Sequence, residues 1–169
     1  SLNNFQVKLI VNTQALISAG KMKNNGDDIR FSDGNCNNLH YWIDSNFNTT
    51  TTVIWVKTKT LNTGNNTLFM YYGNPCATAA QNGDSTFILF DHFAGGSLDA
   101  GKWNTYSSSG VATYNTATSN LTVSATNDAS IRSVSSFTSP IRFEAKVKAY
   151  SGTLPHISIV NNGSFAGYG

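Results

Sequence analysis

Apolar and polar side chains alternate along this chain with a period of two, and this pattern most constrains its fold. The clearest example is residues 141–149, in which Ile141, Phe143 and Val147 alternate with charged side chains. Residues 5–11 repeat the pattern. Because successive side chains of a strand point to opposite faces, such segments predict strands with one buried and one wet face.

Strand-like patterns also occur in most of the remaining chain. Residues 52–57 and 68–72 carry apolar side chains on both faces, which predicts two-faced strands, the first of them central in its sheet. Only residues 13–22 are a helical candidate. Short strands separated by polar turns are typical of an all-β fold built from antiparallel β-sandwiches. Further strands are expected at residues 28–32, 39–44, 87–93, 121–123, 131–134 and 157–159, the last entering a hairpin at Asn162–Gly163.

A stretch without large apolar side chains, residues 77–85, predicts a domain boundary, because little of it could be buried. We therefore expect two antiparallel sandwich units in tandem, jelly-roll-like, at residues 1–86 and 87–169.

The composition excludes several classes of protein. Charged residues make up 12% of the chain, about half the usual share, whereas Asn, Thr and Ser number 21, 19 and 19. The aromatic and β-branched content disfavours disorder, and no apolar run is long enough to cross a membrane. The eleven basic residues are scattered, which argues against nucleic-acid binding. A surface of amides and hydroxyls suits an extracellular or cell-surface protein.

Two covalent features are consistent with export. Cys36 and Cys76 either close one loop, which would stabilise the fold by ~4 kcal/mol, or remain separate buried thiols. Candidate glycosylation sequons begin at Asn48, Asn65, Asn120 and Asn162.

Four motifs suggest a family. They are DIRFSD at 28–33, YWID at 41–44, IWVK at 54–57 and MYYGNP at 70–75. In order and spacing, residues 4–90 resemble the prokaryotic surface domain called domain of unknown function 2341. The resemblance implies a β-sandwich in extracellular, multi-module proteins, and no established activity.

The following segment has a second resemblance. FDHF at 90–93, GSLD at 96–99 and KW at 102–103 are similar to the opening of a concanavalin A-like (laminin-G-like) sandwich. Sandwiches of that kind need up to ~200 residues, so the second unit is expected to be incomplete. The resemblance also implies Asp91 or Asp99 as ligands of a structural calcium ion, and no other cofactor is expected.

We expect this chain to have no catalytic activity of its own. Hydrolysis of glycosides needs a pair of carboxyl groups, and the single glutamate, Glu144, shares its face with Lys146 and Lys148. The three histidines stand apart from any nucleophile or zinc motif. An oxygen-rich turn beginning at Asp33 lacks the Gly and Glu of a calcium-binding EF-hand.

Glycan recognition is the positive hypothesis, because aromatic rings beside amides and hydroxyls match both faces of a sugar. The candidate platforms are Tyr41, Trp42, Tyr71 and Tyr72. Each adjacent pair must point to opposite faces, so one member of each is expected in the core and the other exposed or under a loop. We therefore expect a non-catalytic recognition or adhesion module for a polysaccharide or glycoprotein. The alternatives are a surface-layer or filament subunit that self-associates through open β-edges, and a fragment of a polysaccharide-degrading enzyme whose catalytic residues lie elsewhere.

Overall fold

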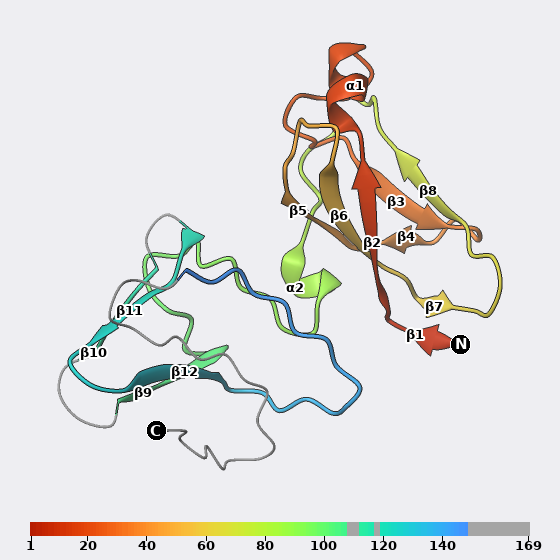
Figure 1. The fold of residues 1–169 in the computed structure, drawn as a ribbon. Helices are drawn as coiled ribbons and strands as arrows, with labels where there is room; N and C mark the ends of the chain where they lie inside the picture. Colours follow the sequence, from red (N-terminus) through yellow and green to blue (C-terminus); the bar gives the residue numbers. More distant parts are fainter. Residues whose placement is uncertain (108–111, 117–118, 149–169) are drawn as a thin grey trace. The chain divides into compact units, whose positions relative to one another are not determined.

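The structure, a computed structural model, describes residues 1–107, 112–116 and 119–148 (Figure 1). The chain divides into two compact units, Ser1–His92 and Phe93–Gly169. The division therefore falls after His92, whereas the run of small residues pointed to a boundary between residues 86 and 87. Each unit is described by itself below.

Two three-stranded antiparallel sheets form the first unit (Figure 1). One has the strand order β2-β6-β5 and the other the order β4-β3-β8. The strand predicted at 52–57 is the central one of its sheet, and the all-β antiparallel fold class is confirmed. The strands are β2 Gln6–Val11, β3 Arg30–Asp33, β4 Asn38–Leu39, β5 Tyr41–Ser45, β6 Thr52–Lys57 and β8 Leu68–Tyr71, and a short pair joins β1 Leu2–Asn3 to β7 Thr60–Leu61.

The core of this unit lies between the two sheets. Ile54 and Val56 from β6 are completely buried, and Phe31 from β3 meets the ring of Tyr41 from β5 at 5.3 Å. Alternate positions of each strand supply these side chains, as the period of two requires. The full set of buried apolar residues in this cluster is Met22, Ile29, Phe31, Leu39, Tyr41, Ile54 and Val56.

A short helix, α1 Thr13–Ser18, closes one end of the sandwich (Figure 1). The side chain of Asn12 caps it by accepting from the backbone N–H of Ala15 at 3.0 Å. The helix is shorter than the predicted residues 13–22 because Gly20 adopts a φ of 66°, which a continuing helix does not allow.

β8 differs from the prediction that both of its faces are buried. Leu68 and Met70 pack against the core, whereas Phe69 and Tyr71 are 46% and 51% exposed. The strand lies at the end of its sheet, so its alternate residues face solvent although they are aromatic.

The described residues of the second unit form two antiparallel pairs of strands. β9 Trp103–Ser107 pairs with β12 Ala129–Ser133, and β10 Ala112–Asn115 pairs with β11 Thr122–Ala125. The Tyr114 hydroxyl links the pairs, because it donates to the Tyr106 carbonyl at 2.8 Å and to the Ser130 carbonyl at 3.3 Å.

Two predicted strands are not formed. Residues 87–93 are irregular, because their rings pack against neighbouring side chains instead of pairing in a ladder. Residues 141–148 are also irregular, and Phe143 and Val147 are about half exposed. Alternating side chains favour a strand at residues 141–148, but no strand among the described residues pairs with this segment. The strand and hairpin expected near residues 157–163 lie outside the described part of the chain.

Candidate functional site

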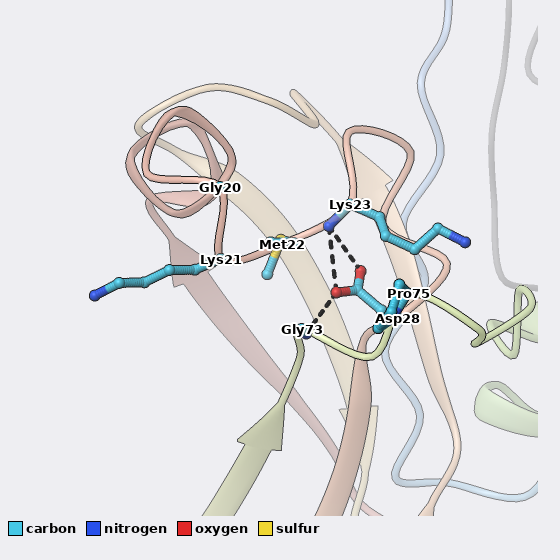
Figure 2. Close-up of a pocket in the computed structure, with 7 residues that line it drawn as sticks. All are labelled: Gly20, Lys21, Met22, Lys23, Asp28, Gly73 and Pro75. Carbon is cyan, nitrogen blue, oxygen red and sulfur yellow. Dashed lines mark hydrogen bonds between the residues drawn. The ribbon is translucent and has the colours of Figure 1, made fainter.

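Two of the four motifs that suggested a family, those at residues 28–33 and 70–75, form a structural tie between two loops (Figure 2). The Asp28 carboxylate, only 2% exposed, accepts from the backbone N–H of Lys23 through both oxygens, at 3.1 and 3.2 Å, and from that of Gly73 at 2.6 Å. Gly73 has a φ of 95°, and a Cβ there would lie 3.1 Å from the Lys21 carbonyl. An aspartate and a glycine are therefore both needed for this geometry.

Arg30 strengthens the same tie. Its guanidinium donates to the backbone carbonyls of Asp27, Ile29 and Thr78, the last at 2.7 Å. The arginine thereby joins the loop before β3 to the segment that follows β8. The motif residues thus hold the ends of the strands together.

A pocket of about 130 Å³ opens beside Asp28. The side chains of Lys21 and Lys23 extend away from the carboxylate (Figure 2), and the Lys23 ammonium donates to the Ala77 carbonyl at 2.9 Å. Because both Asp28 oxygens already accept from amides, the pocket offers no uncommitted carboxylate for chemistry. Its lining residues are Gly20, Lys21, Met22, Lys23, Asp28, Gly73 and Pro75.

Tyr41 and Trp42 point to opposite faces of β5, as predicted. Tyr41 is in the core, where its hydroxyl donates to the Ile29 carbonyl at 2.8 Å and burial raises the pKa of its phenol. A buried ring cannot stack on a sugar, so the candidacy of Tyr41 as a platform is not supported by its position.

Trp42 lies beneath residues 83–92, which we name the aromatic strap. Its ring meets Phe90 at 4.5 Å and His92 at 5.3 Å, and the neighbouring Trp55 meets Phe87 at 5.9 Å. The strap thus covers the outer face of β5 and β6. Trp55 is 6% exposed as a result, although it lies outside the space between the sheets, and both faces of the strand predicted at residues 52–57 are therefore covered.

Polar contacts fix the aromatic strap at its start, in α2 Gly83–Thr86. The Gln6 side-chain amide donates to the Thr86 carbonyl at 2.9 Å, and the Lys57 ammonium donates to the Ser85 carbonyl at 3.1 Å. A Cβ on Gly83 would lie 2.2 Å from the Phe90 ring, so only glycine fits there. The covering of β5 and β6 by the aromatic strap was not predicted from the sequence, because small residues precede its rings.

Two exposed aromatic residues lie close together on β8. Phe69 and Tyr71 are two residues apart and share the outer face, with ring centroids 6.5 Å apart. Tyr72 is 39% exposed. Phe69 was not among the predicted platforms, although its position two residues from Tyr71 placed it on the same face.

Small polar groups surround these rings. In the register of the sheet, Ser32 lies opposite Phe69 and Arg30 lies opposite Tyr71. The Tyr71 hydroxyl is 3.2 Å from the Ser32 hydroxyl, and the exposed Asn38 is paired with Ser32 on the next strand. We name the surface formed by Arg30, Ser32, Asn38, Phe69 and Tyr71 the β8 face.

The two calcium candidates, Asp91 and Asp99, lie in different local settings. Asp99 accepts from the Gly101 N–H at 2.8 Å and so closes a turn, while Asp91 lies in the aromatic strap. Within the described residues, no group of three or more His, Cys, Asp or Glu side chains could hold a metal ion.

The turn at Asp33 is held by its own hydrogen bonds. The Asn37 side chain and backbone and the Asn35 N–H all donate to the Asp33 carboxylate. These bonds, with that of the Asn37 side chain foremost, lower the pKa of Asp33. The carboxylate thus stabilises a local turn.

The covalent candidates lie on the surface. Cys36 and Cys76 are both exposed and free, so neither is the buried thiol of the second expectation and no bond joins them. Asn48, Asn65 and Asn120 are exposed, whereas Asn162 lies outside the described residues.

Comparison with known protein families gives a match. Residues 25–106 match the model of a family described as Domain of unknown function (DUF2341). This match supports the resemblance drawn from the four motifs, and it includes Asp28, Arg30 and Gly73 of the structural tie. Strand β2 and helix α1 precede the matched residues, although they complete the same sandwich. No curated protein and no solved structure matches the chain.

Proposed function

We propose that this chain is a non-catalytic, extracellular recognition module that binds glycans through the β8 face. The observation that carries the proposal is the pair of exposed rings, Phe69 and Tyr71, on one face of a strand near the exposed amide of Asn38. Aromatic rings provide rigid apolar area for the C–H face of a sugar, and the neighbouring polar groups match its hydroxyls.

The surface chemistry agrees with this role. Solubility comes from neutral amides and hydroxyls, and the most buried carboxylate in the first unit is committed to backbone amides. Candidate sequons at Asn48, Asn65 and Asn120 are exposed, as export and glycosylation would require. We retain the similarity of residues 90–103 to a concanavalin A-like sandwich, with its structural calcium, as part of the proposal. No helix among the described residues is long and apolar enough to cross a membrane.

The test is calorimetric titration of the full chain with a panel of polysaccharides. Phe69→Ala and Tyr71→Ala should each weaken binding by about tenfold or more, since aromatic contact residues carry much of the affinity of an interface. The matched control is Ile10→Ala, because Ile10 is a 68% exposed apolar residue on the other sheet. Binding that is unaffected by both aromatic changes would refute the β8 face as the site.

A second candidate function, assembly through strand edges, is favoured by exposed apolar side chains near the start of the chain. Leu2 on β1, Phe5 between the strands and Ile10 on β2 are 52%, 44% and 68% exposed, and β2 lies at the end of its sheet. Such an edge can pair with another chain. A mass by light scattering that stays monomeric at rising concentration would argue against it.

A further inference from the structure

The two rings of the β8 face are not coplanar. The Phe69 and Tyr71 rings are tilted by 45° relative to one another across a centroid separation of 6.5 Å. Two rings tilted in this way cannot both lie flat against a planar surface, such as that of a crystalline polysaccharide. They can each stack on a sugar of a chain that turns between successive units.

The protein restrains one of the two rings, that of Tyr71. The Tyr71 hydroxyl is held 3.2 Å from that of Ser32, which is itself only 4% exposed, and Ser32 donates to the Asp33 carbonyl. The neighbouring strand therefore restrains the ring before any ligand arrives. A restrained ring loses little freedom on binding, which favours a ligand that already has the matching twist.

Charge on the β8 face is restricted to Arg30. Its guanidinium donates to three backbone carbonyls, those of Asp27, Ile29 and Thr78. The groups beside the rings, Ser32 and Asn38, are neutral. An arginine already engaged by carbonyls is poorly placed to hold the bidentate carboxylate or sulfate of an acidic glycan.

From the ring geometry and the charges together, we infer that the ligand of the β8 face is a soluble, uncharged polysaccharide with a twisted chain. This inference rests on the proposed glycan-binding function and narrows it to one class of ligand. It excludes flat crystalline surfaces and polyanions as the preferred partners.

The experiment compares three classes of probe with the full chain. Soluble starch, laminarin and mannan represent neutral, soluble chains; crystalline cellulose and chitin represent flat surfaces; and alginate and heparin represent polyanions. At least one neutral chain should bind, with an affinity that does not change when the salt concentration is raised, because no ion pair contributes.

Two substitutions of Tyr71 test whether the polysaccharide binds at the tilted rings. Tyr71→Ala should lose about tenfold or more in affinity for the neutral chain, whereas Tyr71→Phe, which keeps the ring, should lose less. Stronger retention on crystalline cellulose or chitin, or salt-sensitive binding to alginate or heparin, would overturn the inference while leaving glycan binding intact. Failure of all seven polysaccharides to bind would instead overturn the proposed function and this inference with it.

Discussion

The two units of this chain differ in what they bury. In the first unit, two sheets enclose Phe31, Ile54 and Val56, each at most 2% exposed. In the second unit the described residues form strand pairs, and the one fully buried side chain among them is Thr116, which donates to the Gly95 carbonyl. Alternation of side chains is therefore sufficient for strands, whereas a core also needs a second sheet to face the first.

The largest effect is expected from removing core volume in the first unit. Ile54→Ala should lower the free energy of unfolding by about 2–5 kcal/mol, because it leaves a cavity that the surrounding sheets cannot fill. The matched change in the second unit is Ile131→Ala on β12, where the side chain is half-buried, and it should cost about 1 kcal/mol. Urea denaturation measures both, and equal losses would remove the distinction between the units.

The next largest loss of stability is expected from breaking the structural tie of the first unit, at Asp28. Asp28→Ala leaves the N–H groups of Lys23 and Gly73 without their acceptor, which should cost about 1–3 kcal/mol. Asp44→Ala, at an exposed position, should change stability by no more than about 0.5 kcal/mol. Equal stability of the two variants in urea would show that the motif residues do not hold the loops together.

The position of the aromatic strap over Trp42 and Trp55 can be tested by a substitution that leaves every aromatic ring in place. Gly83→Ala would place a Cβ 2.2 Å from Phe90 and should cost about 1–3 kcal/mol as the strap is displaced. It should also change the fluorescence of Trp42 and Trp55 beneath the strap. Gly34→Ala is the control, since its Cβ would meet nothing within 4 Å. An unchanged spectrum for Gly83→Ala would show that the strap does not cover these rings in solution.

The smallest effect is expected from pH at the Asp33 turn. Because hydrogen bonds lower the pKa of Asp33 below 3.8 in the folded state, its contribution to stability is present above that value and is lost as the pH falls through the folded-state pKa. Asp33→Asn should flatten the acid side of the stability profile slightly. NMR titration of the wild-type carboxyl checks the direction, and an Asp33 pKa above 3.8 would contradict it.

Much of the first unit could be predicted from local pattern. The central position of residues 52–57 follows from their two apolar faces, and the opposite directions of Tyr41 and Trp42 follow from their adjacency. The covering of Trp42 could not be predicted, because it depends on a segment that returns from about 50 residues later in the chain without forming a strand.

The aromatic residues of the candidate site were predicted only in part, because their burial also depends on segments that are distant in the sequence. Tyr71 was identified and is exposed, whereas Tyr41 is buried by the opposite sheet and Phe69 was not among the predicted platforms. Which ring of an aromatic strand faces solvent is decided by whether another layer covers that face. In residues 141–148, which carry the cleanest alternation, the described part of the chain supplies no pairing strand, and the pattern alone did not make one.

The most direct test of the contrast between the units is amide hydrogen exchange on the full chain. The slowest exchange should occur in β6, whose amides lie between β2 and β5 over a closed core, and the paired strands of the second unit should exchange much faster. Protection in β9 and β12 that equals or exceeds that of β6 would contradict the account.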